Sequence, residues 1–341
     1  MRLPWSRPWL VGALAAVATA SAGRGQAPAR SSVRAVAHAE REVPVTSRSA
    51  LPTSELAVRS AAQWTTWWRS DAAPVRWAGA PDDGPLTRAM RWRPGAAGIE
   101  WGEVPLAGRG EAWRTRLIVV RMDLRHVALC LDTAFTGSLR ADWSLARAPA
   151  GAVVAVNAGQ FVSSLPWGWV VLAGREYLAP GYGPTSSAFI VDLSGNVRWI
   201  HGTAIGAPMR TAGVAWAFQS YPTLLEDGEV NLALQGSGRG VDVGHRDARL
   251  AIGTLRDGRV LVAMTRFDAL GEGLGFVPFG LTAPEMAAVM GALGAVDAVM
   301  LDGGISAQLL VREADGAARR WPGVRRVPLA LMAVPRVSAA Q

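Results

Sequence analysis

An apolar run late in the chain ends in a carboxylate that two glycines follow. The run Val296–Leu301 leads directly into Asp302, Gly303 and Gly304, and Ser306 lies two residues further on. Glycine has no Cβ, so a ligand can approach its backbone closely. Loops at the ends of strands are also where binding and catalytic residues concentrate. The pattern therefore indicates a candidate site, and the alternative is a plain tight turn.

A second set of polar residues surrounds the start of another apolar run. Alternate side chains of a strand share a face. Ala248, Leu250 and Ile252 are therefore expected to face the core. His245, Asp247 and Arg249 would then point together to the opposite face. The planar fork of an arginine can grip a phosphate through two hydrogen bonds. The alternative is an exposed strand face with ordinary cross-strand pairs.

A third candidate is Asn157, which ends the apolar run Val153–Val156 and is followed closely by Gly159. The amide of asparagine offers donors and an acceptor that suit sugar hydroxyls. Asparagine also tolerates turn conformations, which is the simpler explanation. The motifs of zinc proteases, EF-hands, nucleotide-binding P-loops and serine hydrolases are absent from the sequence, and its four histidines lack metal-ligand spacing. No metal and no cofactor are therefore predicted.

The elements that must position these residues are mainly short strands. Three predicted hairpins turn at Ser194-Gly195-Asn196, at Asp227-Gly228 and at Asp257-Gly258, and Asp-Gly supplies the positive φ angles of a tight turn. Further strands are expected at 116–124, 127–131, 153–156, 296–301 and 307–311.

One helix has clear boundary signals. Thr282 and Glu285 form a capping-box pattern, Pro284 is tolerated in the first turn, and Gly294 can end the helix. Glu285 is therefore interpreted as a capping residue rather than a catalytic acid. Strands dominate and connections are short, which predicts an α+β fold with largely antiparallel sheet and a few helices.

The chain divides into three parts by composition. Residues 1–22 have the basic start, apolar run and A-x-A ending of a secretory signal peptide, with an uncleaved membrane anchor as the alternative. Residues 23–98 are expected to be a flexible leader rich in Arg, Pro and Trp, with one possible helix over Ser54–Ser70. Residues 99–341 form the single main domain and are expected to fold without the leader. The protein is thus predicted to be exported, periplasmic or extracellular, with no stable membrane span after cleavage.

The net charge of +8 does not indicate a nucleic-acid-binding protein. All 35 basic residues are arginines, and residues 99–341 hold 22 of them against 21 acids. The positive excess lies in the first 98 residues, whereas nucleic-acid-binding domains concentrate it on one face of the fold. Cys130 stands alone in an apolar run, which excludes an internal disulfide framework.

Several of these segments resemble, in order, the motifs of the phosphodiester glycosidase domain family, which includes the uncovering enzyme and bacterial exopolysaccharide-related proteins. Asn157–Phe161 is similar to the family's Asn-Gly-Gly-Phe-Phe, and Gln219–Leu225 to its Gly-Pro-Leu-Leu stretch. Arg249–Gly253 is similar to Arg-Thr-Ala-Ile-Gly. Gly280-Leu281-Thr282, a helix and Leu301–Ser306 are similar to Gly-Leu-Thr, a helix and Leu-Asp-Gly-Gly-Gly-Ser. The resemblance spans about residues 99–335, and Ala158, Gln160 and Ile305 depart from it.

The resemblance implies hydrolysis of a sugar 1-phosphodiester, such as an N-acetylhexosamine 1-phosphodiester, at the glycosidic bond. Asp302 and Asp247 would be the catalytic residues, Arg249 would bind the phosphate, and Asn157 and Ser306 would orient the sugar hydroxyls. His245, Gly159, Gly303 and Gly304 complete the expected substrate-binding set. The partner would be a glycan or sugar phosphate, and the oligomeric state is left open.

Two other functions fit the same sequence. A fold does not fix a function, so one alternative is a non-catalytic glycan-binding or envelope-assembly protein. The other is an exported peptide-binding scaffold that uses the Trp-rich leader.

Overall fold

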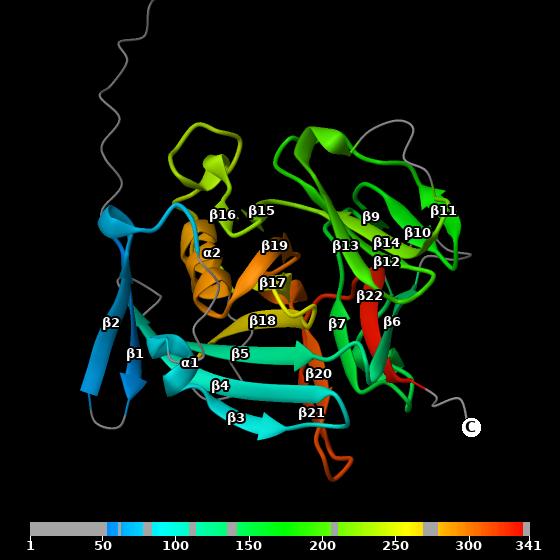
Figure 1. Cartoon of the computed structure of the whole chain (residues 1–341), viewed down its shortest axis with the longest axis horizontal. Helices are drawn as coiled ribbons and strands as arrows, with labels where there is room; N and C mark the ends of the chain where they lie inside the picture. The colour runs from blue at the N-terminus through cyan, green and yellow to red at the C-terminus, as the bar shows by residue number, and fades with distance from the viewer. Residues whose placement is uncertain are drawn as a thin grey trace, which may run out of the picture. The chain divides into compact units, whose positions relative to one another are not determined.

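The largest layer of the structure is an antiparallel sheet, built because the chain is rich in short apolar strands separated by turn residues (Figure 1). The computed structural model of the chain describes residues 53–60, 63–77, 84–108, 114–134, 142–205, 211–268 and 279–336. All of them belong to one unit, Leu51–Gln341. The expected signal peptide and residues 23–50 lie outside the described residues.

Ten strands form the large sheet within the described ranges, in the order β16-β15-β19-β17-β18-β5-β4-β1-β2, with β3 paired to β4. Their bounds are β1 Glu55–Ser60, β2 Gln63–Arg69, β3 Arg91–Pro94, β4 Ile99–Gly108, β5 Thr115–Met122, β15 Thr223–Glu226, β16 Glu229–Val230, β17 Leu250–Leu255, β18 Val260–Phe267 and β19 Ala295–Leu301.

Two smaller antiparallel sheets accompany it. One has the order β11-β10-β14-β12-β13, and its strands are β10 Val170–Leu172, β11 Arg175–Leu178, β12 Ser187–Asp192, β13 Val197–His201 and β14 Val214–Ser220. The other has the order β21-β20-β7-β22-β6, and its strands are β6 Val127–Thr133, β7 Val154–Asn157, β20 Leu309–Arg312, β21 Ala318–Trp321 and β22 Leu329–Pro335. A short hairpin, β8 Phe161–Val162 and β9 Leu165–Pro166, stands apart from these sheets. All three predicted hairpins are present.

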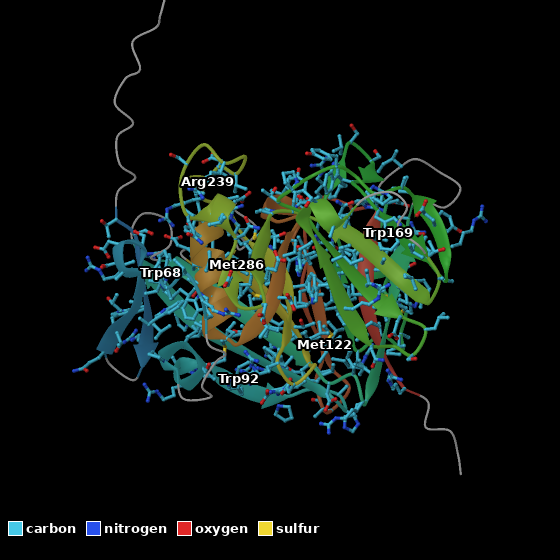
Figure 2. The ribbon with its side chains drawn as sticks, turned by 45° about the horizontal axis from the view of Figure 1, so that its top comes forward. Trp68, Trp92, Met122, Trp169, Arg239 and Met286 are labelled. Atoms are coloured by element: carbon cyan, nitrogen blue, oxygen red, sulfur yellow. The ribbon has the colours of Figure 1, made fainter. Side chains whose placement is uncertain are left out.

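Both faces of the large sheet are covered, because its strands alternate between two apolar clusters. On β5, Ile118 and Val120 join the cluster shared with the two smaller sheets, whereas Leu117 and Val119 join a cluster under the helices. Figure 2 labels Met286 on α2 and Trp68 on β2, which both belong to the second cluster. Within β17 both faces are buried, since Ala251 is as buried as Leu250 and Ile252, and the expected polar row of His245, Asp247 and Arg249 lies just before the strand.

Helices are few in the part of the chain that the structure describes. They are α1, Pro85–Ala89, and α2, Ala283–Ala292, with a few single turns of 3-10 helix. The α2 helix lies against β15 and β19 (Figure 1) and has the predicted capping box, with Thr282 as N-cap and Glu285 three residues on. The fold is thus mostly antiparallel β, a correction to the expected α+β class.

The helix expected over Ser54–Ser70 is a β-hairpin instead. The tryptophan spacing fitted a helix, but β-branched and aromatic residues at 64–68 favour an extended chain. In the hairpin Leu56 pairs with Trp68, and both are buried. Strand β1 then pairs with β4, where Val58 lies opposite Leu106. The folded unit therefore begins upstream of Ile99, where the sequence had placed its start.

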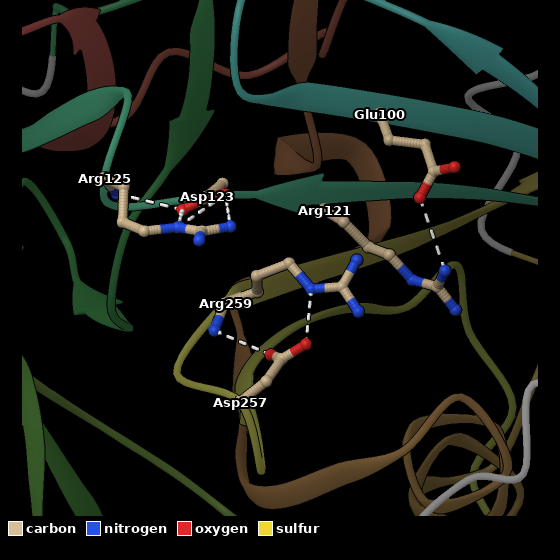
Figure 3. A network of polar contacts seen from close by, with 6 residues as sticks. All are labelled: Glu100, Arg121, Asp123, Arg125, Asp257 and Arg259. Atoms are coloured by element: carbon tan, nitrogen blue, oxygen red, sulfur yellow. Dashed lines mark hydrogen bonds and ion pairs between the residues drawn. The ribbon is translucent and has the colours of Figure 1, made fainter.

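Ion pairs hold the turns at one end of the large sheet (Figure 3). After β5, the Nη2 of Arg125 lies 2.6 Å from Oδ2 of Asp123, and hydrogen bonding from Arg125 lowers the pKa of Asp123 to about 2. In the β17–β18 turn, Nε of Arg259 lies 2.7 Å from Oδ2 of Asp257. The third pair in the figure joins β5 to β4, where Nη1 of Arg121 donates to Oε2 of Glu100 at 3.3 Å.

None of the helices in the described ranges is long and apolar enough to cross a membrane.

Candidate active site

The predicted site residues gather where strand ends of two sheets meet. Strands β17 and β19 are antiparallel, and Leu250, the first residue of β17, lies opposite Leu301, the last residue of β19. Arg249, just before β17, and Asp302, just after β19, are therefore at the same edge of the sheet. The amide of Asp302 donates to the carbonyl of Gly159, two residues beyond β7, at 2.9 Å. The segments around Asp302, Arg249 and Gly159 therefore form one locality.

The two glycines after Asp302 allow close packing between chain segments. A Cβ on Gly303 would lie 2.3 Å from the carbonyl oxygen of Ala248. Gly304 has φ +54°, its amide donates to the same carbonyl at 2.7 Å, and a Cβ there would lie 3.0 Å from Oδ2 of Asp247. Only glycine at both positions lets the segment before β17 approach the end of β19 this closely.

Asp302 is a mostly buried carboxylate with unused bonding capacity. Its Oδ2 is buried and has no hydrogen-bond partner among the described residues. Burial raises the pKa of Asp302, and repulsion from Asp247 raises it further. A hydrogen bond from Ser306 and the charge of Arg325 act in the opposite direction. An orphaned buried carboxylate oxygen is costly for stability, and such groups concentrate at functional sites.

Asp247 is the second carboxylate of the site. Burial raises its pKa, while the charge of Arg249, the amide of Ala248 and the charge of His245 partly offset this. The Ala248 amide donates to Oδ1 of Asp247 at 2.7 Å, and Nε2 of His245 lies 3.9 Å from Oδ2. The His245 side chain is 61% exposed, which places it at the rim of the site.

Arg249 is held in one orientation by backbone carbonyls. Its Nε donates to the carbonyl of Leu281 at 2.7 Å, and its Nη2 donates to that of His245 at 2.5 Å. Its own amide donates to Oγ1 of Thr265 at 2.7 Å. Burial lowers the pKa of Arg249, although the charge of Asp247 counters this. The Nη1–Nη2 end of the guanidinium still offers N–H groups for an anion.

Asn157 is fully engaged by the backbone around Asp302. Its Nδ2 donates to the carbonyl of Asp302 at 2.8 Å, and its Oδ1 accepts from the amide of Gln308 at 3.0 Å. The residue is 1% exposed. Its buried amide therefore positions the loop that holds Asp302 and Ser306, and the sugar contact expected from the sequence stays a prediction.

Arg325 belongs to the same locality and was missed in the sequence. Its guanidinium carbon lies 4.7 Å from the centre of the Phe161 ring, and its charge lowers the pKa of Asp302. The Arg325 amide donates to the carbonyl of Ile305 at 3.0 Å. The only available signal was a basic pair, Arg325-Arg326, ahead of an apolar run, which is too common to single out.

In the described ranges, neither the site nor any other place has a group of three or more His, Cys, Asp or Glu side chains that could hold a metal ion. What the arrangement offers is two interacting carboxylates and two guanidinium groups around one strand edge. Such a set can transfer protons and bind an anion.

Solved structures of similar fold were found by comparison. The catalytic domain of zebrafish N-acetylglucosamine-1-phosphodiester alpha-N-acetylglucosaminidase, auto-inhibited by its pro-peptide, is 17% identical, with a TM-score of 0.52, 78% of this chain covered and 92% of that chain. A hypothetical protein from Synechocystis is 18% identical (TM-score 0.43, 72% of this chain covered), and the alignment spans only 64% of its length. A Burkholderia pseudomallei protein described as exported is 18% identical (TM-score 0.42, 65% and 74% covered). No curated protein matches the sequence.

The family comparison covers the site itself. Residues 150–334, more than half of the 341-residue chain, match the phosphodiester glycosidase family. That range includes both carboxylates, both guanidinium groups and the strands that place them. The zebrafish structure is similar in fold over 78% of this chain. On this match, which confirms the resemblance seen in the motifs, the chain belongs to the phosphodiester glycosidase family.

Proposed function

We propose that the protein is an exported hydrolase that cleaves a sugar 1-phosphodiester at its glycosidic bond, with an N-acetylhexosamine as the sugar. The observation that supports this most is Asp302, whose buried Oδ2 has no partner. It lies in a site with a second carboxylate and two guanidinium groups, within a domain of the phosphodiester glycosidase family. A substrate with an electrophilic carbon beside a phosphate fits this combination of charges.

The proposed reaction breaks the bond between the anomeric carbon and its phosphate oxygen. That oxygen keeps the electron pair and leaves as a phosphomonoester, and water supplies the new oxygen on the sugar. The transition state resembles an oxocarbenium ion, which a nearby carboxylate stabilises. A phosphomonoester is a stable anion, so it needs less help from a general acid than an alkoxide does.

The two carboxylates divide the proton chemistry. Asp302 feels burial and the repulsion of Asp247, so it holds a proton to higher pH and can donate it to the leaving oxygen. Burial raises the pKa of Asp247 as well, but the charges of Arg249 and His245 offset part of that rise, and we assign Asp247 the role of accepting the proton of the attacking water. The two groups interact, so any measured pKa values belong to the pair rather than to one residue.

The guanidinium groups bind the phosphate. Arg249 is preorganised by its bonds to two carbonyls and presents its Nη1–Nη2 end, while Arg325 is exposed and steadied by the Phe161 ring. Two such groups neutralise the diester and the developing charge on the leaving group. Ser306, whose side chain hydrogen-bonds Asp302, and the backbone of Gly303 and Gly304 would contact the sugar.

Turnover of a synthetic N-acetylglucosamine 1-phosphodiester tests the proposal. The mature protein should release a reducing sugar and a phosphomonoester in equal amounts. Asp302→Asn should lower kcat by at least about 100-fold, the usual contribution of a general acid or base. The matched control is Asp315→Asn, on an exposed turn, which should retain full activity.

The rival binding function predicts a different pattern. A glycan-binding protein would bind the diester without turnover, and Asp302→Asn would leave its affinity unchanged. Export has its own test: N-terminal sequencing of secreted or periplasmic material should start at about Ser21 to Gly23. Recovery of the intact N-terminus in membranes would contradict export.

A further inference from the structure

We propose that the Arg246–Glu285 ion pair is a positioning device for Asp247 and Arg249, an inference that rests on the proposed function. The pair is bidentate: Nη1 of Arg246 lies 2.7 Å from Oε2 of Glu285, and Nη2 lies 2.7 Å from Oε1. The Glu285 side chain is fully buried and that of Arg246 is 18% exposed. Buried charges of this kind need good geometry and further hydrogen bonds to be tolerated.

Glu285 has a second bond that ties the pair to the start of α2. Its Oε2 accepts the amide of Thr282 at 2.9 Å, while Oγ1 of Thr282 accepts the amide of Glu285 at 3.3 Å. One carboxylate oxygen is thus shared between the helix cap and Arg246. Capping alone requires no arginine, so the ion pair adds a connection that the helix does not need.

The connection continues into the active-site segment through two neighbouring carbonyls. Nη1 of Arg246 also donates to the carbonyl of Gly280 at 3.1 Å. The next residue, Leu281, exchanges two backbone bonds with Asp247, at 3.1 and 3.0 Å. The Leu281 carbonyl also accepts Nε of Arg249 at 2.7 Å. A single peptide unit therefore sets both the backbone of Asp247 and the guanidinium plane of Arg249.

The charges of the pair also act on Arg249. Glu285 raises the pKa of Arg249 and Arg246 lowers it, so the two charges of the pair act on Arg249 in opposite directions. Arg246 itself lines a separate cavity of about 550 Å³ with Trp68, Trp77 and Thr282. It acts on the site through the backbone and is not placed against the substrate. Catalysis is sensitive to such placement, since a shift of about 1 Å can cost about 100-fold in rate.

The test compares two variants of the pair with a control that damages only the helix cap. Glu285→Gln keeps an acceptor for the Thr282 amide but loses the charge, and Arg246→Lys keeps the charge but loses the fork. Both should lower kcat for the sugar phosphodiester by about 10- to 100-fold and shift its pH profile. Thr282→Ala breaks the cap without touching Arg246, so it should lower Tm and leave kcat and the pH profile unchanged.

The outcomes separate this inference from the proposed function. If all three variants lower Tm alone and keep the wild-type pH profile, the pair is only structural and the inference is wrong. If Glu285→Gln does not fold, Arg246→Lys decides by the same readouts. If the wild type shows no turnover, the proposed function fails, and calorimetry with N-acetylglucosamine 1-phosphate decides instead. About tenfold weaker binding by Arg246→Lys with intact binding by Thr282→Ala supports positioning, and unchanged binding by both overturns it.

Discussion

Replacing Asp302 by Asn should stabilise the folded protein at neutral pH while it removes activity. Burial raises the pKa of Asp302 above its usual value of 3.8, so the folded state disfavours the charged carboxylate. Such a group favours folding only while it is protonated, and this contribution is lost as the pH rises through its folded-state pKa. Asparagine has nearly the same size and no charge, so it avoids that loss.

The size of the gain follows from one buried oxygen without a partner. Leaving a buried polar group unsatisfied costs about 1–3 kcal/mol, and more for a charged one, so exchanging the carboxylate for a neutral amide recovers only the extra cost of the charge, on the order of 1–2 kcal/mol. A change of 1 kcal/mol shifts Tm by about 2–4 °C for domains of 150–250 residues. A rise in Tm of about 2–8 °C at pH 7 is therefore expected. Below the usual carboxyl pKa, near pH 3, the wild type is protonated as well and the two proteins should melt together.

The assay is thermal unfolding of the wild type and Asp302→Asn across this pH range, with Asp123→Asn as a control of opposite sign. Hydrogen bonding from Arg125 lowers the pKa of Asp123 to about 2 (Figure 3). That contribution is present above pH 3.8 and is lost as the pH falls through about 2, so the control should be slightly destabilised at pH 7. The effect should be small because the Arg125 side chain is 86% exposed.

Two results would refute the reasoning on Asp302. A variant that melts below the wild type at pH 7 would show that the carboxylate stabilises the fold. A gain that is the same at pH 3 and pH 7 would show that the charge is not its cause.

Three further predictions concern the fold and the site. A chain that starts at Gly98 should aggregate on heating rather than melt cooperatively in a scanning measurement, because it lacks the strands that cover the edge of β4. Asn157→Ala should lower the free energy of unfolding by about 2–3 kcal/mol in urea and reduce kcat, because two buried hydrogen bonds to the Asp302 loop are lost. Arg325→Lys should raise KM for the diester by about 2- to 5-fold, since lysine loses the fork and much of the contact with Phe161, whereas Arg326→Lys, its exposed neighbour, should not.

Local signals predicted much of the fold. The Asp-Gly and Ser-Gly-Asn turns fix hairpins through backbone angles that few other residues adopt, and the capping box at Thr282 fixes the start of α2. The sequence suggested a helix where the structure has the hairpin at 55–69, because over so short a stretch the tryptophan spacing fits both the helical period and the strand period. The extended conformation is set by the pairing of Val58 with β4, a long-range contact that the sequence alone does not reveal.

The site was also predicted only in part, because some of its residues follow from local strand patterns and others depend on long-range contacts. The register of β17 and β19 brings Arg249 and Asp302 together, and each stands at the end of a recognisable strand. The role of Asn157 depends on a carbonyl 145 residues away, so the residue type alone suggested a sugar contact instead. Arg325 is placed by the loop between β21 and β22 and by the ring of Phe161, which are long-range contacts without a local pattern.

The position of bond cleavage tests the central claim most directly. Hydrolysis of the N-acetylglucosamine 1-phosphodiester in water enriched with ¹⁸O, followed by mass spectrometry of the phosphate product, shows which bond breaks. Cleavage between the anomeric carbon and oxygen gives a phosphomonoester without the label, and this is the result that a site built on Asp302 and Asp247 predicts. Labelled phosphate would mean attack at phosphorus, and it would contradict a glycosidase mechanism at this site.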